Sequence, residues 1–160
     1  MNLEIIKVAI LTISDSRNKD QDLSGKVIND SLDRDRFTVA SYDLVRDDIE
    51  EIKSRLAHYT DKLEVNLVLT TGGTGFGRRD VTPEATAEIV DKLVPGLAEL
   101  IRIEGGKKTP KAFLSRGVSG IRKNTLIINL PGSPKGAKES LEAIMGIIPH
   151  AIDMIKGRSH

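Results

Sequence analysis

A continuous apolar run near the N-terminus constrains the fold more than any other feature of this chain. Residues 7–14 read Lys-Val-Ala-Ile-Leu-Thr-Ile-Ser, without the apolar–polar alternation of a strand that has one face in water. Such a run is typical of a parallel strand covered by helices on both faces. Further strands are predicted at residues 37–45 and 63–71, and residues 118–121 and 125–130 are predicted to form a hairpin.

Segments with helical spacing of apolar residues lie between these strands. Ser24 is expected to cap a helix over residues 25–34. Thr82 is expected to cap another, which begins at Pro83, carries Leu93 and breaks at Pro95. Further helices are predicted for the segments 49–59, 97–104 and 137–148, the last ended or kinked by Pro149. Strands that alternate with helices define the α/β class. We therefore expect a single domain over residues 1–160 with three α/β/α layers, a mostly parallel central sheet and a late antiparallel hairpin at one edge.

The composition excludes several classes of function. The chain has no Cys, which rules out disulfides, thiolate catalysis and iron–sulfur clusters. A net charge of +1, with two Tyr, three Phe and no Trp, offers no platform for nucleic acid. No apolar stretch approaches the roughly 18 residues of a membrane span, and no signal peptide is visible, so a cytoplasmic protein is expected. His58, His150 and His160 have no spacing that predicts a shared metal.

A glycine-rich turn follows the third predicted strand. The segment Gly72-Gly-Thr-Gly-Phe-Gly-Arg-Arg-Asp80 can adopt φ > 0 at its glycines and bring backbone N–H groups close to a phosphate. The alternative is a tight strand-to-helix turn, and the glycines alone do not decide between the two. No Gly-Lys-Ser/Thr follows, so the loop is not a Walker A sequence, and Arg78 stands where the dinucleotide fingerprint needs glycine.

Polar residues also follow the other predicted strands. Ser14-Asp15, Asp47-Asp48 and the turn Pro131-Gly-Ser-Pro-Lys-Gly136 all fall where parallel strands end at one edge of a sheet, which is where open α/β sheets bind ligands. Ser133 can cap a helix in that turn, and this is the structural alternative to an anion site beside Lys135.

Two aspartates on different loops suggest a metal site. Asp47 and Asp80 could each be an ordinary solvated residue, and Asp80 could serve the start of the next helix. Together in one cleft they could hold Mg²⁺, which binds one or two carboxylates together with phosphate oxygens and water.

Five motifs run through the chain in a fixed order. They are Ile13-Ser-Asp-Ser16, Thr70-Thr-Gly-Gly-Thr-Gly75, Arg78-Arg-Asp-Val-Thr-Pro-Glu-Ala-Thr86, Leu114-Ser-Arg116 and Asn129-Leu-Pro-Gly-Ser-Pro-Lys135. In this order, over nearly the whole chain, they closely resemble the MoaB/Mog family of molybdenum-cofactor proteins.

The resemblance implies a molybdopterin adenylyltransferase of molybdenum-cofactor biosynthesis, which transfers AMP from Mg-ATP to the phosphate of molybdopterin and releases pyrophosphate. It implies that Asp47 and Asp80 are catalytic and bind Mg²⁺. It further assigns nucleotide or pterin binding to Ser14, Asp15, Thr71, Gly72, Gly73, Thr74, Gly75, Arg79, Ser115, Arg116, Asn129, Pro131, Gly132, Ser133 and Lys135. It also implies self-association into trimers or hexamers, and the molybdate-insertion protein of the pathway as a partner.

One position departs from the family pattern. Proline often precedes the acidic pair in the family, whereas Arg46 precedes it here and could pair with Asp47, which leaves Asp48 as a competitor for the same role. The alternative to an enzyme is a molybdopterin-binding or carrier protein without catalytic activity. The presence of Asp47, Asp80 and the glycine-rich loop favours the enzyme.

Overall fold

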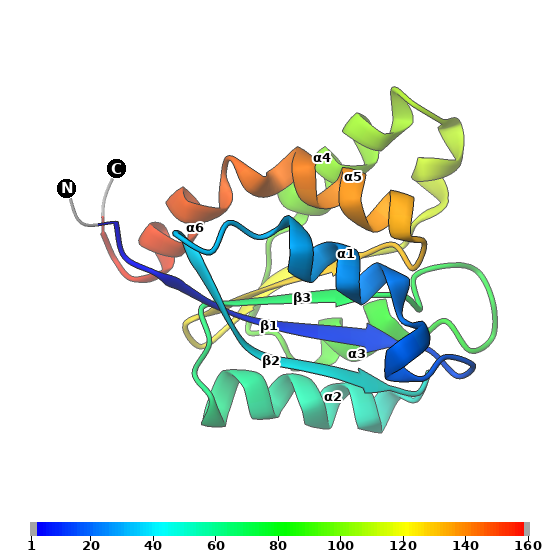
Figure 1. The fold of residues 1–160 in the computed structure, drawn as a ribbon, viewed down its shortest axis with the longest axis horizontal. Coiled ribbons are helices and arrows are strands. Elements are labelled where there is room, and N and C mark those ends of the chain that lie inside the picture. The colour runs from blue at the N-terminus through cyan, green and yellow to red at the C-terminus, as the bar shows by residue number, and fades with distance from the viewer. Residues whose placement is uncertain (1–2, 159–160) are drawn as a thin grey trace.

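A six-stranded sheet forms the centre of the molecule (Figure 1). The computed structural model describes residues 3–158. Within them the strand order is β2-β1-β3-β6-β5-β4. The strands are β1 Ile6–Ile13, β2 Phe37–Val45, β3 Leu67–Thr71, β4 Lys92–Leu93, β5 Ser119–Arg122 and β6 Thr125–Leu130. The first three and β6 are parallel, whereas β5 and β4 pair antiparallel at the edge, which confirms the predicted late hairpin.

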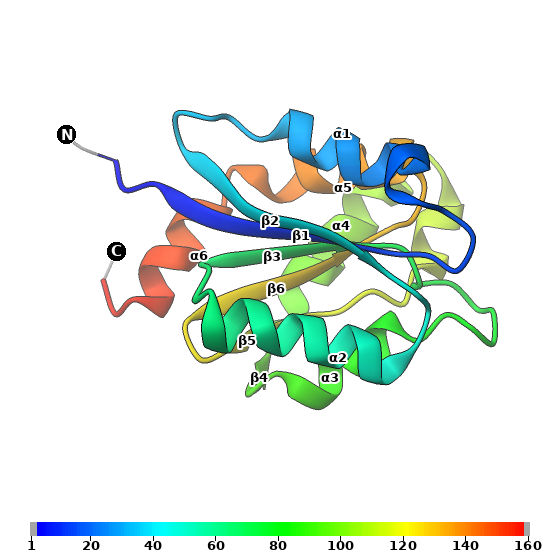
Figure 2. The same ribbon diagram turned by 60° about the horizontal axis from the view of Figure 1, so that its bottom comes forward.

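Helices cover both faces of this sheet (Figures 1 and 2). One face carries α1 Leu23–Ser31, α4 Pro95–Gly106, α5 Pro134–Met145 and α6 Ile148–Ile155, and the other carries α2 Ile49–Ala57 and α3 Thr82–Ile89. Short helical turns lie at η1 Lys19–Gln21, η2 His58–Lys62 and η3 Pro110–Leu114. Alternate residues of β1 enter opposite cores: Val8 and Ile10 pack with the first group of helices, and Ala9 and Leu11 pack with the second. The continuous apolar run is thus explained by burial on both sides.

Four predicted features at the ends of elements are wrong for identifiable reasons. Asp22, not Ser24, caps α1, because its buried carboxylate accepts from Gly25 N at 3.0 Å. Leu93 lies in β4 rather than in a helix, and Pro95 begins α4 instead of only breaking the preceding helix. Thr82 does not cap α3, because its hydroxyl donates to the Gly72 carbonyl at 2.9 Å. Proline fits the first turn of a helix, where its missing N–H has no intrahelical partner to lose.

The carboxyl ends of the four parallel strands meet at one edge, which we call the carboxyl rim. Helices α1 and α2 leave β1 and β2 on opposite faces, so the winding reverses between β1 and β3. Such a reversal opens a crevice beyond the strand ends, the usual ligand position in an open α/β sheet. Both ends of the described chain lie at the opposite edge, where Glu4 accepts from Lys156 and Arg158 (Figure 1). Among the described residues, no helix combines the length and apolar character needed to span a bilayer.

Candidate active site at the carboxyl rim

The glycine-rich loop depends on its glycines for two different reasons. Gly72 and Gly73 have φ of 101° and 70°, in the left-handed region where a Cβ is costly. Gly75 and Gly77 do not have positive φ; a Cβ at either would lie 2.9 Å from Asp80 Oδ2. The predicted conformational freedom is therefore used at the first two glycines, and the other two make room for a carboxylate.

The amides of this loop are only partly available to a ligand. Gly72 N donates to the Leu130 carbonyl at 3.2 Å, so the predicted use of this amide for phosphate is not available in this structure. The amides of Gly73, Thr74 and Gly75 donate to no protein acceptor within residues 3–158. Three adjacent N–H groups without an internal partner are suited to binding an anion.

The two predicted acidic residues flank the same loop. A Cβ on Gly73 would lie 3.1 Å from Asp47 Oδ1, and Asp80 Oδ2 accepts from Gly77 N at 2.8 Å. Asp47 follows β2 and Asp80 ends the loop, so residues far apart in sequence converge where the parallel strands end. Their catalytic roles stay predictions.

Electrostatics at Asp47 suit a cation. Burial raises the pKa of its carboxyl group above its ordinary value, and the nearby carboxylates of Asp15 and Asp80 raise it further. No group of three or more metal-ligating side chains occurs in residues 3–158. Two carboxylates without a third side-chain ligand do fit Mg²⁺, which keeps several waters and shares phosphate oxygens of a substrate. His58 and His150 join no such group, and His160 lies outside the described residues.

Arg46 and Asp48 are both occupied elsewhere. Arg46 Nη2 donates to Glu51 Oε1 at 2.9 Å, so Arg46 pairs with Glu51 in this structure rather than with Asp47. Asp48 caps α2, accepting from Glu51 N at 2.9 Å. Because the cap uses the Asp48 carboxylate, Asp47 is the better placed of the two acids.

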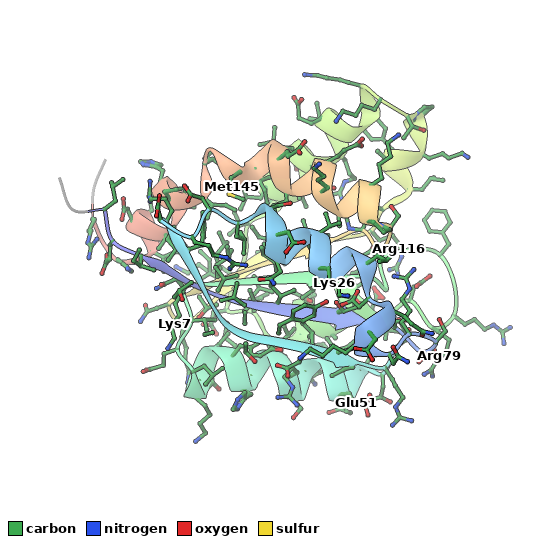
Figure 3. The ribbon with its side chains drawn as sticks, viewed as in Figure 1. Lys7, Lys26, Glu51, Arg79, Arg116 and Met145 are labelled. Carbon is green, nitrogen blue, oxygen red and sulfur yellow. The ribbon has the colours of Figure 1, made fainter. Side chains whose placement is uncertain are left out.

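Asp15, in the loop after β1, contacts both the loop after β2 and the glycine-rich loop. Its carboxylate accepts from Asp47 N at 3.0 Å and from Arg79 Nε and Nη2 at 2.9 and 3.1 Å. The Arg79 guanidinium holds the pKa of Asp15 below its ordinary value. The Ser14 hydroxyl oxygen accepts from the amides of Ser16 and Arg17 within the same turn. Figure 3 shows Arg79 at the rim end of the molecule, far from Lys7.

Asn129 is enclosed by the protein. Its Nδ2 donates to the hydroxyls of Thr70 and Thr86 at 3.0 and 3.1 Å, and its Oδ1 accepts from Val118 N at 3.1 Å. These bonds join β3, α3 and the residue before β5 to β6. The side chain of this predicted ligand residue therefore serves the framework of the rim.

The turn after β6 packs directly against the glycine-rich loop. Thr71 Oγ1 donates to the Pro131 carbonyl at 2.6 Å, and a Cβ on Gly132 would lie 3.2 Å from Gly72 Cα. Ser133 caps α5, accepting from Gly136 N at 3.0 Å, as the structural alternative predicted. Lys135 follows at the exposed start of that helix.

A cavity of about 470 Å³ opens between these turns. The predicted residues that line it are Gly73, Thr74, Gly75, Asp80, Ser115, Pro131, Gly132 and Ser133. Its opposite wall comes from α4, η3 and α5, with Ile101, Thr109, Lys111 and Glu139 among the residues that sequence reasoning missed. In the sequence, that wall is marked by the Thr109-Pro110 step, a hydroxyl before a proline, and by Leu114 of the Leu114-Ser-Arg116 motif. Ser14, Asp15, Asp47, Thr71, Gly72, Arg79, Arg116, Asn129 and Lys135 lie outside the lining.

A crevice at the carboxyl rim, with free amides and Asp80 in its lining and Asp47 on the other flank of the loop, places this protein among the open α/β domains that bind ligands beyond the strand ends. The chain belongs to the family described as "Probable molybdopterin binding domain", whose sequence profile matches residues 9–150. The MoaB/Mog resemblance is thereby confirmed.

Similar proteins include the molybdopterin adenylyltransferase of Helicobacter pylori strain 26695, 42% identical over 159 residues, which cover 97% of this chain and 90% of that protein. The crystal structure of the molybdopterin biosynthesis enzyme MoaB from Thermus thermophilus superposes with a TM-score of 0.90 at 51% identity, covering 96% of this chain and 98% of that one. The molybdenum cofactor synthesis protein cinnamon of Drosophila melanogaster is 42% identical over 157 residues, which cover 96% of this chain and 26% of that protein.

Proposed function

We propose that this protein is a molybdopterin adenylyltransferase that transfers AMP from Mg-ATP to the terminal phosphate of molybdopterin and releases pyrophosphate. One observation carries the proposal: Asp47 and Asp80 lie on either side of three free backbone amides. These are the amides of Gly73, Thr74 and Gly75. The relatives named molybdopterin adenylyltransferase support the same reaction.

The chemistry suits a site without a strong general base. A phosphate monoester has a second pKa of about 6, so the attacking phosphate is already largely ionised at pH 7. The main barrier is the approach of two polyanions, and positioned donors and cations lower it. Bound Mg²⁺ would neutralise phosphate charge and align the attack. Asp47 and Asp80 would hold the metal, and the loop amides would orient the phosphates.

The cavity offers room for the second substrate. Its volume of about 470 Å³ falls within the range of roughly 300–1,000 Å³ that is usual for small-molecule sites. Lys111 and Lys135 stand at or beside its walls and form no ion pair within residues 3–158, so both can attract an anion. Arg79 is paired with Asp15 on the surface, where such pairs contribute little and can exchange partners.

The test is release of pyrophosphate from ATP in the presence of molybdopterin and Mg²⁺. The enzyme should release one pyrophosphate for each adenylylated pterin, and excess EDTA should abolish the reaction. A carrier protein without activity would bind molybdopterin in equilibrium dialysis and release no pyrophosphate. Self-association as a trimer or hexamer belongs to the same proposal, and light scattering of the purified protein measures it.

A further inference from the structure

Arg116 joins separate parts of the glycine-rich loop. Its backbone N donates to the Thr74 carbonyl at 2.9 Å, its Nε to the Gly75 carbonyl at 2.8 Å and its Nη2 to the Asp80 carbonyl at 2.8 Å. These three bonds hold the start and the end of the segment 74–80 from a single residue. Figure 3 shows Arg116 at the same end of the molecule as Arg79.

Glu84 in the first turn of α3 holds the other side of the guanidinium. Arg116 Nη1 donates to Glu84 Oε2 at 2.7 Å, and Nη2 donates to Oε1 at 3.1 Å. Arginine has five N–H groups in a planar fork, and the four side-chain bonds leave only one of them on Nη1. The pairing with Glu84 raises the pKa of Arg116 and lowers that of Glu84, so the charge of Arg116 is balanced within the protein.

We propose that Arg116 and Glu84 form a positioning pair that fixes the backbone of Asp80 and the free amides of the loop, rather than an anion-binding group that contacts the substrate. The catalytic part of this inference rests on the proposed function, whereas the structural part does not.

The contacts of Asp80 explain why the orientation of its carboxylate depends on the Arg116–Glu84 pair. The Asp80 carboxylate is held by Gly77 N at 2.8 Å and its carbonyl by Arg116 Nη2, so the residue is fixed from both its side chain and its backbone. A displacement of about 1 Å at a reacting geometry can cost roughly 10²-fold in rate. Lysine cannot replace the fork, because it carries one compact ammonium group on a flexible stem. Arg116→Lys therefore keeps the positive charge at this position but cannot form the same set of hydrogen bonds.

The first experiment measures hydrogen exchange at the amides of Gly77 and Asp80, which donate to Asp80 Oδ2 and to the Gly77 carbonyl, in the complete protein without substrate or metal. We expect about tenfold faster exchange in Arg116→Lys, the effect of losing one charge-assisted hydrogen bond, and a smaller acceleration in Glu84→Gln. Glu88→Gln is the matched control. Glu88 lies one turn further along α3 and pairs with Lys53 at 2.8 Å, away from the loop. Unchanged exchange in Arg116→Lys would overturn the proposal.

The second experiment separates positioning from substrate contact. In the adenylylation assay, Arg116→Lys should lower kcat about tenfold or more and leave the KM values for ATP and molybdopterin within about twofold. An increased KM with an unchanged kcat would identify Arg116 as a substrate contact instead. If Arg116→Lys shows faster amide exchange but unchanged kcat and KM, the pair holds the loop and has no role in catalysis. A wild-type protein without activity would refute the proposed function, and the exchange measurement would still decide whether the pair holds the loop.

Discussion

Replacing Gly73 by alanine tests whether the shape of the loop is enforced by its surroundings. Gly73 has φ of 70°, and an added Cβ would overlap the Thr82 hydroxyl and lie 3.1 Å from Asp47 Oδ1. The Thr82 hydroxyl is fully buried and donates to the Gly72 carbonyl at 2.9 Å, so it cannot move aside without losing that bond.

The cost has two parts. A left-handed conformation costs alanine roughly 1–2 kcal/mol, and a buried hydrogen-bonding group left without its partner costs roughly 1–3 kcal/mol. Gly73→Ala should therefore lower the free energy of unfolding by about 3 kcal/mol. For a domain of this size, each kcal/mol changes Tm by roughly 2–4 °C, so the expected decrease is about 10 °C. Displacement of Asp47 should also reduce pyrophosphate release.

Two other glycines provide matched controls for thermal denaturation by circular dichroism. Gly157 has φ of 76° with no atom within 4 Å of an added Cβ, so Gly157→Ala should cost at most the left-handed conformation, roughly 1–2 kcal/mol. Gly146 has φ of −67° and the same open space, so Gly146→Ala should be neutral or stabilising by up to about 1 kcal/mol. If Gly73→Ala melts at the same temperature as Gly157→Ala, the Thr82 hydroxyl does not constrain the loop and the reasoning is refuted.

Three further substitutions follow from the same contacts. Asp80→Asn should reduce turnover by at least roughly 10²-fold and largely preserve pterin binding, and near-wild-type turnover would remove Asp80 from the mechanism. Asn129→Leu leaves the Val118 amide without its acceptor, so it should lower stability by roughly 1–3 kcal/mol, and an unchanged Tm with a raised KM for ATP would make Asn129 a ligand residue instead. Burial alone would raise the pKa of Asp22, but hydrogen bonds from Thr12 and other donors outweigh it and lower the pKa. The ionised Asp22 carboxylate therefore stabilises the fold fully above the pKa of about 3.9 that it has in the unfolded chain. This stabilisation is lost as pH falls through the lower pKa that Asp22 has in the folded protein. The Tm difference between the wild type and Asp22→Asn should shrink below about pH 4, and a constant difference would contradict the assignment.

The inner strands β1 and β6 were predictable because burial on both faces leaves a continuous apolar run in the sequence, although the strand predicted over residues 63–71 begins only at Leu67. Residues 37–45 were predicted as a strand and form β2 with the same bounds. The cap of α1 was not predictable, because Thr12 and Tyr42 hold Asp22 through contacts between distant segments. Those donors stabilise the carboxylate as the cap, whereas local sequence preference alone favours Ser24 equally well.

For the site too, the sequence predicts which residues lie at the rim but not which residues they contact. The glycine-rich loop and the two acids follow strand ends, so topology alone brings them to one rim. The partners of the arginines do not follow from topology, since Arg79 pairs with a residue 64 positions away and Arg116 with one 32 positions away. A cation near a predicted phosphate site therefore gives no indication of which acid already balances it. Four residues of the far wall were missed because they belong to none of the five motifs: Ile101, Thr109, Lys111 and Glu139.

Glu4 accepts hydrogen bonds from Lys156 and Arg158 at 2.9 and 2.6 Å, so the two ends of the described chain are adjacent and lie across the sheet from the glycine-rich loop. A tag, a fluorophore or another domain joined near either end of residues 3–158 would be attached at the edge of the sheet opposite the carboxyl rim. This geometry also allows the same fold to be part of a longer polypeptide, as in the Drosophila relative, where the matched region is 26% of the protein.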